Sequence, residues 1–249
     1  MRLTLAEPRL LRESVNIISD LVTEITLRVD KEKIEVVAID PANVALVDFK
    51  LLSSAFAEYT VPKPYELAIN LEYLKSVLKR AKPMDAVTLV LEEEANRLQV
   101  VLFGEGRRTF TVPLIHIEEN EQKVPVLTFA TRVELSSVRF DEAIEDMGIV
   151  SESLSFTSLP EKFLIKAESH QKDAVVEIPA GGETVVQLLQ GDTLTSKYSI
   201  DYLRKISKGG KLADNVVLEF GDDYPLRVEY KLMDRLRLSF ILAPRVSND

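Results

Sequence analysis

Two segments, about half a chain apart, carry basic residues at the same spacing. They are Lys75, Lys79 and Lys82 in residues 71–82, and Arg204, Lys208 and Lys211 in residues 200–211. The i, i+4, i+7 spacing places each set on one stripe of an α-helix. Ammonium and guanidinium groups arranged in this way attract phosphates through charge, without making or breaking a bond. The pattern therefore predicts a surface for a polyanion, presented twice.

The elements that must hold these cations are two amphipathic helices with a second, apolar stripe. That stripe consists of Leu71, Leu74 and Leu78 in the first helix and Ile200, Leu203 and Ile206 in the second. It would face a hydrophobic core and leave the basic stripe outside. Asn70 and Ser199 precede the helices at matching positions, and both residue types favour the N-cap.

The charge of the chain is unevenly distributed. Its 249 residues have a net charge of -9, but each basic segment has four bases and one acid. An acidic body with two basic helices would repel a polyanion from most surfaces and accept it at one. A single charged stripe is usually an ordinary solvated helix face. Its repetition at matched spacing favours the polyanion surface.

Residues that could support catalysis or bind a metal are scarce. The chain has no cysteine, which excludes disulfides, thiol nucleophiles and cysteine-based zinc sites. His116 and His170 lie near no nucleophile motif, and no phosphate-binding glycine loop follows a strand. The acidic run Glu92–Glu94 is more typical of a solvated turn than of a metal site. We therefore expect a protein that is not an enzyme and needs no cofactor or metal.

Two similar halves follow from the order of predicted elements. Each half contains a strand, a helix, three strands, a second helix and three strands, with helices expected at 8–22, 71–82, around 140–147 and at 200–211. The strands are expected at 2–6, 25–29, 33–40, 44–51, 86–91, 98–103 and 108–114, and at 127–135, 153–157, 163–168, 174–178, 215–220, 226–232 and 235–242. Antiparallel meanders with helices on one face indicate an α+β fold.

The boundary between the halves falls in a polar, acidic segment. We expect domains of residues 1–116 and 127–249, joined by a connector of residues 117–126. The chain has no apolar run of about 18 residues and no signal-peptide pattern at its N-terminus, so we expect a soluble protein that is not exported. The final apolar strand of each half would leave a sheet edge open, and oligomerisation is one remedy.

Five motifs resemble a known family. They are Ala38–Val47 (AIDPANVALV), Leu74–Arg80 (LKSVLKR), Arg108–Ile115 (RTFTVPLI), Asp223–Tyr230 (DYPLRVEY) and Leu238–Arg245 (LSFILAPR). In this order and at these intervals they resemble the ring-shaped DNA sliding clamps of the proliferating cell nuclear antigen (PCNA) type, and most closely the archaeal ones. The resemblance implies the DNA-clamp fold, with two similar domains per subunit. Three subunits would close head to tail into a ring, with helices lining the pore and sheets outside.

The resemblance also implies which residues face the DNA. These pore residues are Lys75, Lys79, Arg204, Lys205 and Lys208, to which Arg12, Lys82 and Lys211 are added. Contact with duplex phosphates would be independent of base sequence, as sliding requires. The helix around residues 140–147 is acidic, through Asp141, Glu142, Glu145 and Asp146, and is not expected to hold DNA.

A subunit seam is the use that we expect for this acidic helix. Glu142 and Asp146 of one subunit would face Arg108, or Arg80 or Lys82, of the next. Phe110 would pack beside a neighbouring strand that contains Val175 and Val176. The alternative is a solvated acidic helix with no part in assembly.

A partner-binding groove is implied beneath the connector. Its residues would be Ile39, Val44, Leu46, Val124, Pro225, Ile241, Ala243 and Pro244. Clamp partners insert a short helical turn with a glutamine, an aliphatic residue and two aromatics, and an apolar groove suits that mode. Taken singly, the eight residues are more often part of a plain core. Asn120 and Gln122 depart from the apolar connector of archaeal relatives, which predicts weaker or narrower partner binding.

The expected function is that of a processivity factor which encircles duplex DNA. It would tether DNA polymerase, flap nuclease and ligase, and a separate ATP-driven loader would place it on DNA in the cytoplasm of an archaeal-type cell. Two alternatives stay open: an oligomeric α+β enzyme for phosphorylated ligands, and a scaffold that binds proteins alone. The sequence is compatible with a homotrimer and with a heterotrimer of related chains.

Overall fold

A computed structural model describes residues 1–116 and 122–245 of the chain. These residues form two compact units. Unit 1 contains Met1–Pro41, the described part of Val47–Val124, and Leu232–Leu238. Unit 2 contains Ala42–Leu46, Pro125–Lys231 and the described part of Ser239–Asp249.

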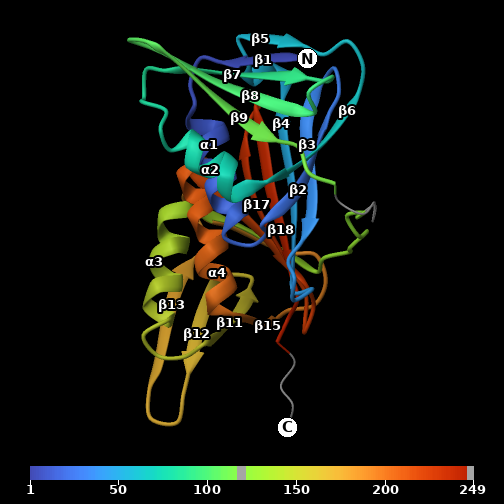
Figure 1. The fold of residues 1–249 in the computed structure, drawn as a ribbon. Coiled ribbons are helices and arrows are strands. Elements are labelled where there is room, and N and C mark those ends of the chain that lie inside the picture. The colour runs from blue at the N-terminus through green and yellow to red at the C-terminus, as the bar shows by residue number, and fades with distance from the viewer. Residues whose placement is uncertain (117–121, 246–249) are drawn as a thin grey trace. The chain divides into compact units, whose positions relative to one another are not determined.

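The elements of the two halves follow the same order (Figure 1). In the first half they are β1 (Arg2–Leu5), α1 (Arg9–Ser19), β2 (Glu24–Val29), β3 (Lys33–Ile39), β4 (Ala45–Leu52), a 3-10 turn η1 (Ser53–Ala55), β5 (Glu58–Thr60), β6 (Tyr65–Asn70), α2 (Leu71–Leu78), β7 (Ala86–Glu92), β8 (Arg97–Phe103) and β9 (Arg107–Pro113). In the second half they are β10 (Thr131–Ser136), α3 (Ser137–Met147), β11 (Ser153–Leu159), β12 (Lys162–Glu168), β13 (Asp173–Pro179), β14 (Val185–Leu188), β15 (Leu194–Ser199), α4 (Ile200–Ser207), a 3-10 turn η2 (Lys208–Lys211), β16 (Asn215–Phe220), β17 (Leu226–Leu232) and β18 (Leu236–Leu242).

The strand order repeats as well. In the first half the orders are β5-β1-β7-β8-β9 and β4-β3-β2-β6, and in the second half they are β14-β10-β16-β17-β18 and β13-β12-β11-β15. If the nine strands of the second half, β10–β18, are renumbered 1–9, their two strand orders are identical to those of the first half. The pairings whose register is known are antiparallel. The internal repeat predicted from the helices therefore extends to the topology, and the α+β class is confirmed.

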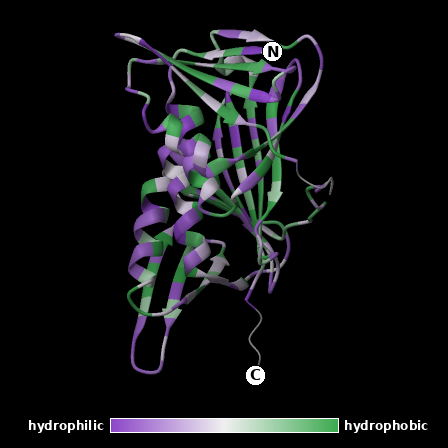
Figure 2. Ribbon diagram, in the orientation of Figure 1, coloured by the Kyte–Doolittle hydropathy of each residue, from purple (hydrophilic) through white to green (hydrophobic). Residues whose placement is uncertain are grey.

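Each unit buries the apolar side of a helix pair against its strands. Helix α1 lies beside α2 and α3 lies beside α4 (Figure 1). Leu11, Val15 and Ile18 form the inward side of α1 and are almost fully buried. Figure 2 shows hydrophobic and hydrophilic residues intermixed along each helix, as in amphipathic helices. Because one side is fixed by burial, the opposite side of each helix is the one available to a partner.

Aromatic packing is concentrated in unit 2. The ring of Phe156 lies 5.3 Å from that of Phe163 and 5.5 Å from that of Tyr198, measured between centroids. Phe140 and Phe220 complete this cluster, and all five side chains have no more than a trace of exposed surface. Rings at these separations contribute packing energy beyond their buried area.

The prediction of three strands between the helices of each half is wrong, because the structure has five. The additional strands are β5, β6, β14 and β15. β5 has only three residues, and β15 has only Leu194 and Tyr198 as large apolar or aromatic residues, so neither has an extended apolar run. The strand expected from Leu127 begins at Thr131, four residues later.

The basic stripes are also shorter than predicted. Helix α2 ends at Leu78, so Lys79 is its C-cap residue and Lys82 lies beyond it. Helix α4 ends at Ser207, and Lys208 and Lys211 belong to η2. The N-cap at Asn70 is confirmed, since its side chain accepts a hydrogen bond from the Tyr73 backbone N–H at 3.2 Å. Ser199 makes no such bond. In the described part of the chain, no helix is long and apolar enough to cross a membrane.

A glycine in η2 provides a test of this packing. A Cβ added at Gly209 would lie 2.2 Å from the ring of Tyr230, which is fully buried. Gly209→Ala should therefore lower the free energy of unfolding by about 1–3 kcal/mol, as overpacking does. At Gly106 an added Cβ would meet no atom within 4 Å, so Gly106→Ala is the control. Chemical denaturation of the three proteins is the measurement, and equal midpoints for Gly209→Ala and wild type would contradict the packing.

Candidate nucleic-acid interface

In unit 1 the first predicted cation, Lys75, forms ion pairs with acidic residues of the same unit. Its Nζ lies 3.6 Å from Oδ1 of Asp20, which follows α1, and 3.5 Å from Oε1 of Glu72. Only 14% of the Lys75 side chain is exposed. The contact with Asp20 therefore joins the two helices of the pair, and the charge of Lys75 is largely compensated before any polyanion arrives.

In unit 2 Arg204 has a matching arrangement. Its Nη2 lies 3.1 Å from Oε2 of Glu145 on α3. The guanidinium packs over Gly148. A Cβ added there would lie 2.2 Å from Nη2, so Arg204 can occupy this place only because residue 148 has no side chain. Arg204 Nε is buried and has no hydrogen-bond acceptor among the described residues. The neighbouring Lys205 places its Nζ 5.4 Å from the ring centroid of Tyr202, a cation–π contact.

The remaining predicted cations differ in their surroundings. Lys79 is exposed and forms no ion pair within the described ranges. Arg12 Nε lies 3.1 Å from Oε1 of the adjacent Glu13, and Lys82 Nζ lies 2.7 Å from Oε2 of Glu105. Lys208 and Lys211 are exposed on η2. The structure thus brings most of these residues onto a helix pair or its end, but places Lys82 at a separate hub.

The acidic side of α3 has two kinds of carboxylate. Glu145 pairs with Arg204, and Asp141 accepts a hydrogen bond from the Ser207 hydroxyl, so both serve contacts inside unit 2. Glu142 and Asp146 are exposed, and neither pairs with a cation in the part of the chain that the structure describes. These two, the residues predicted for the seam, are the ones left available.

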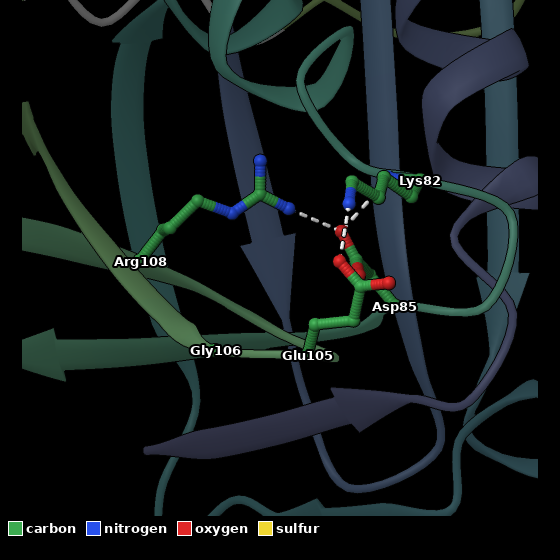
Figure 3. A pocket seen from close by; sticks show the side chains of 5 residues that line it. All are labelled: Lys82, Asp85, Glu105, Gly106 and Arg108. Carbon is green, nitrogen blue, oxygen red and sulfur yellow. Dashed lines mark hydrogen bonds and ion pairs between the residues drawn. The ribbon is translucent and has the colours of Figure 1, made fainter.

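Lys82 belongs to a hub around buried Asp85 (Figure 3). Asp85 is 2% exposed, and its carboxylate accepts a hydrogen bond from the Lys82 backbone N–H at 2.8 Å and a second from Arg108. A cavity of about 270 Å³ lies beside it. A Cβ at Gly104 would lie 2.1 Å from Asp85 Oδ1, so this carboxylate can occupy its place only beside a glycine. The hub ties the turn after α2 to strand β9.

This hub bears on the predicted seam. The sequence predicts that Arg108 faces acids of another subunit, but its guanidinium already contacts Asp85 and donates to the Arg80 carbonyl at 3.0 Å. Lys82 likewise already forms an ion pair, with Glu105. Of the three predicted bases, only the Arg80 side chain has no acidic partner among the residues described. The seam remains a prediction, and Arg80 becomes its best-placed base.

Two edge strands share one pattern of exposure. β9 and β13 each have seven residues and end their sheets, and along both strands exposed positions alternate with half-buried ones. Phe110 on β9 and Val176 on β13 are half-buried, whereas Val175 is 52% exposed. A hollow of about 220 Å³ lies between α3 and β13, with Glu142, Asp146 and Val176 in its lining. β9 in unit 1 and β13 in unit 2 are thus both edge strands with a cavity beside them.

The predicted partner groove stays a prediction. Its residues are distributed over both compact units, and Asn120 of the connector lies outside the described residues. Individually, Leu46 is buried, Val124 is 39% exposed, and Ile39, Val44, Pro225, Ile241 and Pro244 are half-buried, with Ala243 exposed. Gln122 Oε1 is buried without a hydrogen-bond partner in the described ranges.

The clearest pKa shifts belong to buried tyrosines. Burial raises the pKa of the Tyr230 and Tyr198 hydroxyls in the core of unit 2. Among the described residues, no cluster of three histidines, aspartates or glutamates could hold a metal ion. The sequence does not reveal that Asp20, Glu145 and Asp85 act as counter-ions of the basic residues. A basic stripe alone does not reveal which acid will fold against it.

Comparisons with known proteins agree with this architecture. The family described as proliferating cell nuclear antigen, N-terminal domain, matches residues 1–123, and the corresponding C-terminal domain matches residues 123–245. The chain is 35% identical to a DNA polymerase sliding clamp from Nanoarchaeum equitans, over 98% of this chain and 99% of the relative. It is also 35% identical to a DNA polymerase sliding clamp from Pyrococcus furiosus, with 92% and 91% covered.

Solved structures give the same result. A crystal structure of PCNA from Thermococcus kodakaraensis superposes with a TM-score of 0.91 at 28% identity, covering 98% of this chain and 99% of that one. PCNA from Entamoeba histolytica also has a TM-score of 0.91, and at 22% identity it supports the fold alone. Both domain matches, the near-complete coverage and the duplicated topology lead to one conclusion: the chain belongs to the proliferating cell nuclear antigen family.

Proposed function

We propose that this protein is a DNA sliding clamp, a ring of subunits that encircles duplex DNA and gives replication enzymes processivity. The observation that carries the proposal is the pair of duplicated helix layers, each with basic residues on its outer side, in a chain of the PCNA family. The clamp performs no bond chemistry. Its function is topological, because a closed ring cannot leave a closed circle of DNA.

Ring closure is supported by the internal repeat. Inside unit 1, Leu52 on β4 donates its N–H to the carbonyl of Arg235, just before β18, at 2.8 Å. Inside unit 2, Ala243 donates to the Val44 carbonyl at 2.9 Å. β9 and β13 occupy the same positions in their halves as β18 and β4, yet both are edges. Pairing β9 of one subunit with β13 of the next would repeat the β18–β4 pairing.

Such an interface uses two different surfaces of each subunit, and therefore closes only when the rotation completes a circle. The family implies three subunits. The exposed acids Glu142 and Asp146 and the base Arg80 would flank this pairing and add electrostatic attraction. Exposed ion pairs contribute only about 0.2–1 kcal/mol each, so the strand pairing and Phe110 supply the larger share.

Sliding requires attraction without fixed contacts. Lys75 and Arg204 each keep an acid partner, so duplex phosphates would compete with Asp20 and Glu145 rather than meet bare charges. Phosphates follow one another every ~1.7 Å along the duplex, so a cation that leaves one phosphate finds another at once. The compensated helix layers suit diffuse, sequence-independent contact.

The proposed partners are DNA polymerase, flap nuclease, ligase and an ATP-driven clamp loader. They would bind through the groove beneath the connector, with Leu46, Ile241 and Pro244 among its apolar residues. No observation favours the enzyme or the protein-only scaffold over the clamp. A cytoplasmic, nucleoid-associated location follows from the same proposal.

The decisive experiment is topological. The protein is loaded onto nicked circular DNA by an archaeal clamp loader with ATP, and free protein is removed by gel filtration. We expect the clamp to stay with the circle and to dissociate after one restriction cut, because the cut gives it an end. Equal retention on circular and linear DNA would contradict an encircling clamp.

Charge substitutions test the helix layers. Lys79→Gln should weaken duplex binding and reduce the slope of log affinity against log salt by about 0.9 for each phosphate that the protein no longer neutralises. Glu145→Gln should strengthen binding, because it releases Arg204. Lys162→Gln is the control, since Lys162 lies on β12 and pairs with Glu177 at 3.0 Å. Fluorescence anisotropy of a labelled duplex is the measurement, and equal effects at Lys79 and Lys162 would exclude the assignment.

Seam substitutions test the ring interface. Glu142→Gln combined with Asp146→Gln should shift the trimer towards monomer, and Arg80→Gln should do the same, with both effects shrinking at high salt. Glu183→Gln removes an exposed acid from a turn of unit 2 and is the matched control. Sedimentation equilibrium across a salt series measures the shift. If the double variant dissociates like the control, the acids of α3 take no part in assembly.

A further inference from the structure

A polar hollow lies on the outward face of the second-half sheet, away from α3 and α4. It has a volume of about 340 Å³ and is lined by Ser155, Thr157, Lys166, Glu168, Thr195 and Lys197. Three neighbouring strands, β12, β11 and β15, supply these residues. All of them belong to unit 2, so the hollow is complete within one subunit and does not depend on ring closure.

The register of the sheet aligns two lysines on either side of a serine. Ser155 pairs with Lys166 on one neighbouring strand and with Lys197 on the other. Adjacent strands are about 4.8 Å apart, so the two lysine Cα atoms lie about 10 Å from each other on the same face. Their flexible four-carbon stems allow both ammonium groups to converge on one group above Ser155.

These two lysines lack the usual compensation. Both are half-buried, and neither forms an ion pair within the described part of the chain. Lys162 lies four residues before Lys166 on the same face of β12, and it forms an ion pair with Glu177 at 3.0 Å. Two ammonium groups that line one hollow and have no ion-pair partner among the described residues repel each other, and an anion between them would remove that repulsion.

The first half of the chain provides an internal comparison. Ala68 occupies the position in β6 that Lys197 occupies in β15, since each lies two residues before the residue preceding the second helix. Ile115 donates its N–H to the Ala68 carbonyl at 2.9 Å, and Arg245 donates to the Lys197 carbonyl at 2.7 Å. The backbone arrangement is thus the same, with alanine and isoleucine in one copy and lysine and arginine in the other.

Cations on strands β2, β3 and β4 of the first half are compensated. Lys33 and Lys50 both contact Glu35, at 3.1 and 2.8 Å, and Arg28 contacts Glu66 at 3.3 Å. The fold therefore forms without uncompensated lysines on this face. Lys166 and Lys197 are an addition of the second copy that the architecture does not require.

The remaining groups in the hollow define the ligand class. The hydroxyls of Thr157 and Thr195 lie 3.0 Å apart, and when one donates to the other, the acceptor keeps a hydrogen to donate elsewhere. Two ammonium groups and several hydroxyls surround the space, with the carboxylate of Glu168 as the opposing charge. Lysine and serine or threonine are common ligands of phosphate, whose oxygens accept from several directions. A planar carboxylate is better bound by arginine, whose guanidinium donates two parallel hydrogen bonds to the two oxygens.

We propose that this hollow binds a phosphate group between Lys166 and Lys197. The ammonium groups supply the charge, and the hydroxyls of Ser155, Thr157 and Thr195 orient the oxygens. Glu168 limits the affinity, so binding is reversible. The phosphate is either free or part of a nucleic-acid backbone that passes over the outer face of the sheet.

Calorimetric titration of the full-length protein with inorganic phosphate, at ionic strength matched with chloride, tests the site. We expect saturable binding that weakens about 10-fold in Lys166→Gln and again in Lys197→Gln, as the loss of a charge-assisted hydrogen bond predicts. Lys162→Gln, whose lysine has an acid partner, should bind like wild type. Glu168→Gln should bind more tightly, because it removes the opposing charge.

Absence of saturable phosphate binding by wild type, or the same loss in Lys162→Gln as in Lys166→Gln, would overturn the proposal. A second arm uses a short single-stranded oligonucleotide and the Lys166→Gln, Lys197→Gln double variant. If the double variant loses phosphate binding alone, the natural source is free phosphate; if it also loses oligonucleotide affinity, the source is a nucleic-acid backbone. Lys79→Gln separates the two surfaces, because it should affect the oligonucleotide and leave phosphate binding unchanged.

Discussion

Burial of one side of each helix pair is the constraint on which the other features of this chain depend. Leu71, Leu74 and Leu78 are almost completely removed from solvent, and so are Ile200, Leu203 and Ile206. Full burial of such side chains stabilises the fold by about 1.5–3 kcal/mol each. Rotating a helix to hide its basic side would forfeit this energy and bury charge. The direction in which the cations point is therefore a consequence of the hydrophobic core.

Charge compensation then decides how those cations behave. Lys75 and Arg204 are anchored by Asp20 and Glu145, and Arg108 by Asp85. An anchored cation is oriented in advance, but must exchange one anionic partner for another when DNA enters. The net effect is a surface that attracts a polyanion while holding it loosely. This property suits a ring that must move along its substrate, whereas an enzyme that must hold phosphate at one point would need the opposite.

Much of the fold can be predicted from the sequence, because apolar periodicity determines long amphipathic elements. The strands at Asn215–Phe220 and Leu226–Leu232 are predicted to the residue, and the PCNA-type family follows from five ordered motifs. The short and polar strands β5 and β15 escape prediction, because their pairing comes from neighbours rather than from their own pattern. Spacing alone places Lys82 on a helical stripe, whereas the early end of α2 moves it to the Asp85 hub. Contacts between distant residues, such as those of Asp85 with Arg108 or Glu145 with Arg204, have no local signature.

The duplication gives this chain an unusual property: each helix and strand of one half has a counterpart in the other half, in the same strand order. Where the counterparts agree, as at the N-termini of α2 and α4, shared architecture explains the residues. Where they diverge, as at Ala68 and Lys197, the same backbone arrangement supports different side chains. One half can therefore carry surface chemistry that the other half lacks, while both keep the same scaffold.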